Sequence, residues 1–371
     1  MTYLIDGRAL QDRSALRGIG SYVRGLLSGY AELGAASDMS LLLKRGPVPT
    51  EVAAMGIDIA PVRLLQTKRR IQPLADPLLV AAAIRRSHAR LYHGVDYGQP
   101  LQSPVPVVIT VHDLIPFVFP HRYPWMRRER IVALRLLKRA DALIADSHST
   151  ARDLVRIAGA DGDRIHVIPL GVGPQFRRAD DEGIAAVRKQ YGLDRPYLLA
   201  VAAFDPRKRI DLLVDVARAV RRDHDVMLVI AGGQGNFGPR VEAAVTEAGL
   251  REHTVIAGHV DEPTLIRLLS GAACMPFTSE YEGFGLPPLE ALACGTPVAV
   301  FDNSSLREVA GDAAMVITDG DAAAMAARIS TLLGDPAAAS AAGQRGIEWA
   351  ARFTWKETAM STLGVYERLL R

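Results

Sequence analysis

The chain has 371 residues, a formal net charge of +3 and 49% hydrophobic residues. This length is enough for two domains of ordinary size, and so small a net charge gives no reason to expect nucleic-acid binding. Cys274 and Cys294 both lie in apolar segments, which is typical of buried reduced thiols and not of a disulfide or a metal site.

The sequence gives no reason to expect a membrane span or a signal peptide. No uncharged apolar run reaches the roughly 18 residues that a membrane span needs. The first ten residues, MTYLIDGRAL, read as a short apolar strand and not as a signal peptide. We therefore expect a cytoplasmic protein.

Short apolar runs alternate with amphipathic stretches along the whole chain. In the first half the expected strands are residues 3–5, 41–43, 91–93, 107–111, 142–145 and 166–168. In the second half they are residues 198–202, 226–230, 255–257, 273–277, 298–301 and 315–317. Strands rich in Val, Ile and Leu that alternate with helices predict parallel sheets covered on both faces. The predicted fold class is α/β, with two doubly wound Rossmann-like domains facing across a cleft.

A stretch rich in Gly and Pro, IPLGVGPQF at 168–176, predicts a linker between the two domains. The N-terminal domain is then expected at 1–172 and the second domain at 173–354. Residues 355–371 form a last amphipathic helix with no strand after it, and we expect this helix to pack back on the N-terminal domain. Ligands of open α/β sheets bind outside the carboxyl ends of the strands, where the following motifs lie.

The stretch SEYEGFGLPPLEALACGTPVAV places two carboxylates, Glu282 and Glu290, on either side of a glycine turn and a Pro-Pro pair. Proline suits the first turn of a helix, so the turn at 283–286 is expected at a helix N-terminus, where free N–H groups bind anions. Carboxylates bind hydroxyl groups instead. A nucleotide sugar carries both phosphate and hydroxyl groups, so it is the ligand that this motif indicates. The alternative interpretation is a structural turn without a ligand, in which an acid stabilises the helix dipole.

A basic turn, DPRKR, follows the strand expected at 198–202 and contains Arg207 and Lys208. A diphosphate leaving group needs positive charge as its bond to the sugar breaks. The alternative is a solvated basic turn without a ligand.

Two motifs in the first half of the chain lie at the ends of predicted elements, where ligand-binding residues are common. His112 and Asp113 come directly after the strand at 107–111. The histidine would lie either in the domain core or in a ligand site. Asp113 would either orient the imidazole ring or bind the acceptor. Gly18 and Gly20 precede a helix expected to begin near Ser21, which is typical of a loop that binds phosphate or substrate.

A G-x-G-x-x-G turn at 233–238, with Asp261 after the next strand, matches the dinucleotide fingerprint. It indicates a NAD-dependent oxidoreductase as an alternative. However, the fingerprint usually opens the first βαβ unit of its domain, whereas this turn follows a second strand. That reading would also leave the two acids and the basic pair without a role. A non-catalytic nucleotide-sugar-binding protein is a further alternative.

The segment EGFGLPPLEALACGTPVAV resembles the E-x7-E signature of the retaining glycosyltransferases of family 4, which have the GT-B fold. RGIGSYVRGLL, VHDLIP, ADSHSTARDLV, IHVIPLGV, AAFDPRKRIDLL and LVIAGGQG occur in the order that this family shows. The resemblance therefore covers most of the chain.

The resemblance implies roles for individual residues. Glu290 would bind ribose hydroxyls, Glu282 would bind the donor sugar, and Lys208 would grip the diphosphate. Many members have an arginine where this chain has Ala203, so Arg207 would share that task. His112 would contact the donor sugar or the reaction centre. The remaining implied donor contacts are the amides of Phe284, Gly285 and Leu286 at phosphate, Val260 near the base, and Gly20 where donor and acceptor approach each other.

The implied reaction is the transfer of a hexose, with retention, from a nucleotide-diphosphate sugar to a saccharide or lipid-linked saccharide acceptor. No cofactor and no metal ion are expected. The PRK turn resembles that of bacterial mannosyltransferases acting on surface polysaccharides, which points to GDP-mannose. The basic aromatic stretch at 119–143 leaves a peripheral membrane contact open, although a helix face exposed to solvent is the favoured interpretation.

Overall fold

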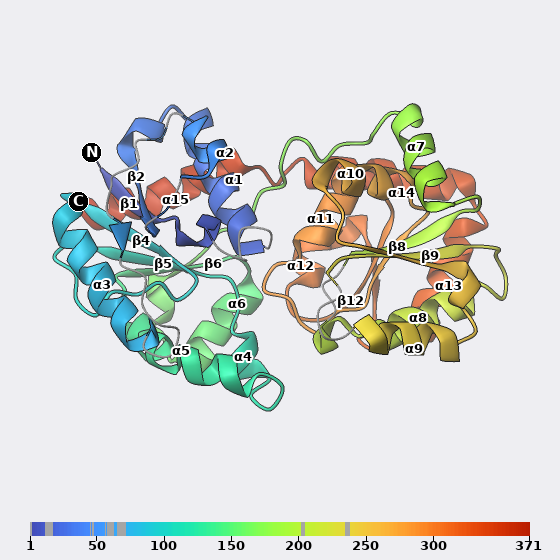
Figure 1. Cartoon of the computed structure of the whole chain (residues 1–371), viewed down its shortest axis with the longest axis horizontal. Helices are drawn as coiled ribbons and strands as arrows, with labels where there is room; N and C mark the ends of the chain where they lie inside the picture. Colours follow the sequence, from blue (N-terminus) through green and yellow to red (C-terminus); the bar gives the residue numbers. More distant parts are fainter. Residues whose placement is uncertain are drawn as a thin grey trace. The chain divides into compact units, whose positions relative to one another are not determined.

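The computed structural model describes residues 2–11, 18–44, 46, 48–55, 57, 63–64, 72–201, 205–233 and 238–371. The chain divides into two compact units, each with its own sheet and core (Figure 1). Unit 1 comprises Met1–Gly171 and Phe353–Arg371, and unit 2 comprises Val172–Arg352.

Unit 1 is built on a parallel sheet with the strand order β3-β2-β1-β4-β5-β6-β7. Its strands are β1 (Tyr3–Asp6), β2 (Met39–Lys44), β3 (Arg63–Leu64), β4 (Leu91–Val95), β5 (Val107–Val111), β6 (Ala142–Ala145) and β7 (Ile165–Val167). The direction of strand addition reverses between β1 and β4, as in Rossmann folds. Side chains following these two strands therefore lie at the point where such sheets bind ligands.

Helices cover both faces of this sheet. The helices of unit 1 are α1 (Gly18–Glu32), α2 (Thr50–Ala53), α3 (Gln72–Ser87), α4 (Ile115–Val118), α5 (Pro124–Leu136), α6 (His148–Asp153) and α15 (Trp355–Leu370). Buried side chains of α3 and α5 pack on one face, and α1 and α15 hydrogen-bond to strands on the other. Short helical turns include η1 (Arg8–Gln11) after β1.

The C-terminal helix α15 is an integral part of unit 1 (Figure 1). Gly25 and Gly29 of α1 leave room for Trp355, which packs directly against that helix. The Tyr366 hydroxyl lies 2.9 Å from the Tyr30 hydroxyl and also contacts Nδ1 of His93 on β4. Because this histidine is fully enclosed, burial lowers its pKa to about 3, so the imidazole is neutral and can join the chain of hydroxyl groups.

Unit 2 repeats the arrangement of unit 1. Its strands are β8 (Tyr197–Val201), β9 (Met227–Ala231), β10 (Thr254–Gly258), β11 (Met275–Phe277), β12 (Val298–Phe301) and β13 (Met315–Ile317). They form two parallel sheets, β10-β9-β8 and β11-β12-β13. A parallel bridge between Leu198 and Cys274 joins β8 to β11, and the Leu199 amide donates to the Cys274 carbonyl at 3.0 Å. The strands thus follow the order β10-β9-β8-β11-β12-β13, with the reversal between β8 and β11.

Helices again lie on both faces of the sheet. They are α7 (Asp181–Tyr191), α8 (Ile210–Val220), α9 (Gly238–Glu247), α10 (Glu262–Gly271), α11 (Leu286–Ala293), α12 (Leu306–Ala310), α13 (Ala322–Leu333) and α14 (Pro336–Ala350). Helices α8, α9 and α13 share an apolar core with one face. On the other face, the Tyr197 hydroxyl of β8 donates to the Leu268 carbonyl of α10 at 2.7 Å.

The predicted fold class is confirmed: both units are α/β with parallel sheets, and each expected strand is present within one or two residues of its bounds. The two-residue strand β3 was not predicted, because it is too short to show a pattern. Cys274 and Cys294 are buried free thiols, as expected.

Among the helices that the structure describes, none combines the length and apolar character needed to cross a bilayer. Helix α5 buries Leu134 and Leu136, whereas Trp125 at its start is 73% exposed. Contact of this helix with a membrane stays a prediction.

The packing of α15 on α1 gives a test of this fold. A Cβ atom at Gly29 would overlap the Trp355 backbone and lie 2.8 Å from the Ala359 Cβ. We expect Gly29→Ala to lower the free energy of unfolding by about 1–3 kcal/mol, as overpacking usually does. Urea unfolding followed by tryptophan fluorescence measures this change.

Gly364→Ala is the matched control, because Gly364 lies on α15 and a Cβ there meets no atom within 4 Å. It should be neutral or stabilise the protein by up to about 1 kcal/mol, since alanine is the better helix former. Equal stability of the two variants would contradict the close helix contact.

Candidate functional site

The basic turn after β8 is a short 3-10 helix, η7 (Pro206–Lys208). The Asp205 carboxylate caps it by accepting the Arg207 amide at 3.1 Å, and Pro206 occupies its first position. Arg209 then adopts a left-handed conformation with φ of 48°, which turns the chain into α8. The Lys208 side chain is buried as a result, and not solvated as the alternative interpretation required. Ala203 lies outside the described residues.

Arg207, Lys208 and Glu282 form one ion cluster. Arg207 Nη1 lies 2.9 Å from Glu282 Oε2, and Lys208 Nζ pairs directly with Glu282 Oε1. The Lys208 ammonium also lies 5.0 Å from the ring centroid of Phe277, at the end of β11. The structure therefore brings together the three residues predicted from two separate motifs.

The charge state of this cluster follows from its contacts. Burial alone would raise the pKa of Glu282, but the positive charges of Lys208 and Arg207 outweigh it and lower the pKa to about 2. Glu282 is therefore an anion at neutral pH. Arg207 Nε also lies 3.7 Å from Asp205 Oδ1, so the two cations of the cluster are balanced by two carboxylates.

The glycine turn lies at the N-terminus of α11, as predicted. Gly285 is the N-cap with φ of 105°, a conformation that favours glycine, and prolines follow in the first turn. Ser305 Oγ donates to the carbonyls of Glu282 and Phe284 at 3.0 and 2.6 Å and so fixes the turn from its carbonyl side. Within the described part of the chain, the amides of Gly285 and Leu286 make no hydrogen bond.

Glu290 lies on α11 and takes no part in the ion cluster. Burial raises the pKa of its carboxyl group to about 7, and the negative charge of Glu262 on α10 adds to the shift. No residue in the described ranges hydrogen-bonds to this carboxyl group. It is thus a half-buried acid near its titration midpoint at neutral pH, with hydrogen-bonding capacity left for a ligand.

Val260 lies in the short connection between β10 and Asp261, the N-cap of α10. Gly258 has φ of 68°, and its carbonyl accepts the Gly232 amide at 2.7 Å, which joins the ends of β9 and β10. Asp261 caps α10 by accepting the Thr264 amide at 3.0 Å. The acid that the dinucleotide alternative assigned to a ribose therefore has a structural task, while residues 234–237 of that fingerprint lie outside the described residues.

In unit 1, His112 pairs with Asp146, which follows β6. His112 Nδ1 lies 2.6 Å from Asp146 Oδ2, and the edge of Tyr22 on α1 contacts the imidazole with centroids 4.7 Å apart. Nε2 of the histidine is buried without a partner among the described residues. The side chain is held by one nitrogen and has the other available.

Burial acts to lower the pKa of His112, but the charge and hydrogen bond of Asp146 outweigh it, so the pKa lies above its ordinary value. From the sequence, Asp113 was one candidate to orient this imidazole. That assignment is wrong, because Asp113 Oδ1 accepts the Ile115 amide at 2.9 Å and Asp146 holds the ring. Asp146 was missed, although its place directly after a strand, like that of His112, was a usable signal.

The expected glycine loop at the start of α1 also needs correction. The helix begins at Gly18, so Gly18 and Gly20 lie in its first turn and not in a loop before it. Residues 12–17 lie outside the described residues. The role of Gly20 stays a prediction.

Comparison with known proteins shows similarity along most of the chain. Residues 16–176 match the family described as Glycosyltransferase Family 4, and residues 184–349 match Glycosyl transferases group 1. The chain is 30% identical to O-antigen chain mannosyltransferase B of Escherichia coli over 321 residues, which is 83% of each protein. The chain belongs to glycosyltransferase family 4.

Two further similarities agree with this membership. The glycosyltransferase is 33% identical to a D-inositol 3-phosphate glycosyltransferase of Xylanimonas cellulosilytica over 71% of this chain and 66% of that protein. Its fold resembles that of Anabaena HepE, solved in complex with UDP-glucose, with a TM-score of 0.78 and 18% identity over 100% of this chain and 99% of the other. At this identity the second similarity concerns the GT-B fold alone.

Family membership makes the chain an enzyme of the glycosyltransferase class and sets aside the oxidoreductase alternative. In the described part of the chain, no three His, Cys, Asp or Glu side chains are grouped so that they could hold a metal ion.

The pairing of His112 with Asp146 can be tested by titration. We expect Asp146→Asn to lower the pKa of His112, because the neutral amide removes both the charge and the charge-assisted hydrogen bond that stabilise the imidazolium. NMR titration of the His112 Cε1 proton measures the shift.

Asp113→Asn is the matched control, since it removes a neighbouring charge that does not hold the ring. Its shift should be clearly smaller. If both variants shifted the pKa of His112 equally, the summed charge of the surrounding carboxylates, and not the pairing with Asp146, would set its charge.

Proposed function

We propose that unit 2 of this glycosyltransferase binds a nucleotide-diphosphate sugar, and that the enzyme transfers the hexose with retention to a saccharide or lipid-linked saccharide acceptor bound by unit 1. The observation that carries the proposal is the cation cluster of Arg207, Lys208 and Glu282 at the carboxyl ends of β8 and β11. Ligands of open α/β sheets bind at this reversal of strand order.

The cations stabilise the leaving diphosphate in this proposal. Negative charge grows on the diphosphate as the glycosidic bond breaks, and fixed positive charge lowers the energy of that transition state. Glu282 has a supporting task, because a buried ammonium without a nearby anion tends to lose its proton. By holding Lys208 and Arg207 ionised in place, Glu282 keeps the site ready for phosphate and lies where the donor sugar would sit.

The N-terminus of α11 supplies the second source of positive potential. The amides of Gly285 and Leu286, with that of Phe284, would donate to phosphate oxygens, aided by the helix dipole. This arrangement needs no divalent ion for charge compensation. Turnover should accordingly persist in EDTA.

The nucleoside would lie toward Glu290 and Val260. An ionised carboxylate accepts two hydroxyl hydrogens, so Glu290 suits the vicinal hydroxyls of a ribose. Val260 offers an apolar contact for the base. In unit 1, the unpartnered Nε2 of His112 would hydrogen-bond the donor sugar.

The proposed chemistry is attack on the same face from which the diphosphate departs. The acceptor oxygen bonds to the anomeric carbon, the bond from that carbon to the diphosphate oxygen breaks, and the acceptor proton passes to the leaving phosphate. For the sugar we propose mannose from GDP-mannose, supported by the similarity to a mannosyltransferase and by the PRK turn. A panel of GDP-, UDP- and ADP-sugars tests this choice by release of the nucleoside diphosphate.

Lys208→Ala tests the role of the cation cluster. We expect turnover to fall by about 100- to 1,000-fold, because the variant removes a charge that acts on the transition state. Steady-state release of nucleoside diphosphate measures this. The exposed Lys189→Ala on α7 is the control and should keep normal turnover.

Loss of Lys208 leaves Glu282 with one cation fewer, so the single variant could lower stability. The double variant Lys208→Ala/Glu282→Gln removes that charge as well and should recover stability without recovering turnover. Normal turnover in a folded Lys208 variant would refute its assigned role.

Glu290 gives a pH-dependent test of donor binding. Its carboxyl group has a pKa near 7 in the free protein, and ribose hydroxyls bind the ionised form best. Binding should therefore lower this pKa and release protons at pH 6–7. Isothermal titration calorimetry in buffers of different ionisation enthalpy measures the proton count.

Glu290→Gln should abolish the proton release and weaken donor binding about 10- to 100-fold, the strength of a hydrogen bond to a charged group. Glu262→Gln is the matched control, since it lowers the pKa of Glu290 and should reduce proton release while donor affinity is kept. Unchanged proton release in the Glu290 variant would contradict the ribose assignment.

A further inference from the structure

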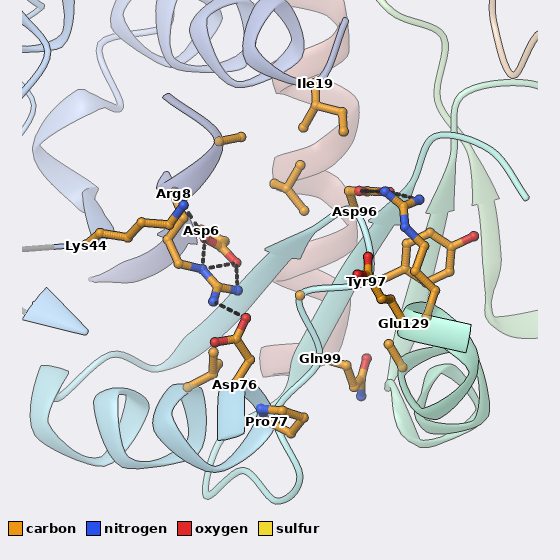
Figure 2. Close-up of a pocket in the computed structure, with 16 residues that line it drawn as sticks. Asp6, Arg8, Ile19, Lys44, Asp76, Pro77, Asp96, Tyr97, Gln99 and Glu129 are labelled. Carbon is orange, nitrogen blue, oxygen red and sulfur yellow. Dashed lines mark hydrogen bonds and ion pairs between the residues drawn. The ribbon is translucent and has the colours of Figure 1, made fainter. Parts of the chain in front are cut away.

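Unit 1 contains a cavity of about 330 Å³ at the reversal of its own sheet, where β1 and β4 end (Figure 2). Its described wall comes from the ends of β1 and β4, from η1, and from helices α3 and α5. The volume is at the lower end of the roughly 300–1,000 Å³ found for small-molecule sites. The cavity thus lies at the place in the sheet of unit 1 that corresponds to the place of the cation cluster in the sheet of unit 2.

One side of the cavity is a fixed ion group around Arg8 (Figure 2). The Arg8 guanidinium donates from Nε to Asp6 Oδ1 at 2.8 Å and from Nη2 to Asp6 Oδ2 at 2.6 Å, and Nη1 reaches Asp76 at 3.2 Å. The Tyr92 hydroxyl donates a hydrogen bond to Asp6 Oδ2 at 3.2 Å. Gly98 completes the packing, since a Cβ there would lie 2.6 Å from Asp6 Oδ2. These side chains are held before any ligand arrives.

The facing side is a second ion pair, Arg130 with Asp96, at 3.0 Å. Arg130 also lies over the Tyr97 ring, 4.7 Å from its centroid. Asp96 and Tyr97 are consecutive non-glycine residues with φ of 46° and 59°, a conformation that L-residues rarely adopt and that clusters at functional sites. The Tyr97 hydroxyl donates to the Asp113 carbonyl at 2.8 Å, which fixes this wall beside His112.

The charges of the wall disfavour an anionic ligand. Both arginines in the described wall, Arg8 and Arg130, already hold carboxylates. The acids lining the cavity, Asp6, Asp76, Asp96 and Glu129, outnumber the bases Arg8, Lys44 and Arg130. A phosphate would have to displace a carboxylate and would be repelled by the others.

A neutral polyol fits the same wall without that penalty. Hydroxyl groups can donate to carboxylate oxygens and accept from guanidinium N–H groups that lie side by side. In addition, the Oε1 atom of the buried Gln99 has no hydrogen-bond partner within the described residues. An unpaired buried acceptor favours a ligand that brings a donor.

We propose that this cavity binds the terminal, uncharged sugar unit of the acceptor, and that phosphorylated acceptors are rejected. The inference rests on the proposed function, because it names the acceptor of that reaction. The preference for an uncharged acceptor distinguishes this enzyme from a transferase that uses a phosphorylated polyol.

The experiment compares acceptors with the full-length enzyme and a donor that it turns over. Methyl α-D-mannopyranoside and methyl α-D-glucopyranoside are the neutral probes, and mannose 6-phosphate and inositol 1-phosphate are the anionic ones. We expect transfer to a neutral probe with a kcat/KM at least about tenfold above that of either anionic probe, which is the discrimination that one unfavourable charge contact produces.

Two variants connect the preference to the cavity. Gln99→Met keeps the side-chain length and removes the free acceptor, and Asp96→Asn removes one acid while keeping the shape. Each should raise the KM for the neutral probe about tenfold or more, the effect of one lost hydrogen bond to a buried or charged group. Asp96→Asn should also reduce the difference in kcat/KM between the neutral and the anionic probes. Asp163→Asn, an exposed acid of unit 1 outside the cavity, is the control and should leave the KM unchanged.

The outcomes distinguish the two proposals. If no nucleotide sugar is hydrolysed or transferred at all, the proposed function fails. If transfer occurs but anionic probes are used as well as neutral ones, or if neither cavity variant changes the KM, the assignment of this cavity is overturned while the transferase remains.

Discussion

The placement of the candidate donor site depends on one buried carboxylate, Glu282, which holds two cations. Burying Arg207 and Lys208 without an anion would carry a large desolvation penalty, and the ion pairs offset it. The same contact ties the loop after β11 to the turn after β8. The Arg207 carbonyl also accepts the Glu280 amide at 2.7 Å, and the Thr278 hydroxyl donates to the Lys208 carbonyl at 2.9 Å. Two loops are thus joined into one rigid edge, and the N-terminus of α11 follows directly from it.

Both units place chemistry-bearing side chains at the reversal of their strand order. In unit 2 the reversal lies between β8 and β11, and the cation cluster follows those two strands. In unit 1 it lies between β1 and β4, where Asp6 and Arg8 stand at the end of β1 and Asp96, which holds Arg130 of α5, follows β4. The difference is in charge balance. In unit 2 two cations balance two carboxylates beside the N-terminus of α11, an arrangement that suits phosphate. In unit 1 the acids outnumber the bases, an arrangement that suits hydroxyl groups.

Much of this could be predicted from the sequence because it depends on local patterns. Apolar strands alternating with helices predicted both sheets, and the glycine turn with its prolines predicted the N-terminus of α11. Pairings between distant residues could not be predicted in this way. His112 and Asp146 are 34 residues apart and meet only because β5 and β6 are neighbours. The left-handed conformation of Tyr97 has no signal in its residue type, whereas Asp96 is of a type that adopts this conformation more often than most. The raised pKa of Glu290 depends on burial and on Glu262.

The contact of α15 with α1 has a consequence for biosynthesis. Unit 2 is one uninterrupted stretch of chain, whereas unit 1 needs its first 171 residues and its last helix. On the ribosome, the face of α1 around Gly25 and Gly29 therefore stays uncovered until translation has passed through the whole of unit 2 and reached Trp355. The half of the enzyme that is synthesised first is the half that is completed last.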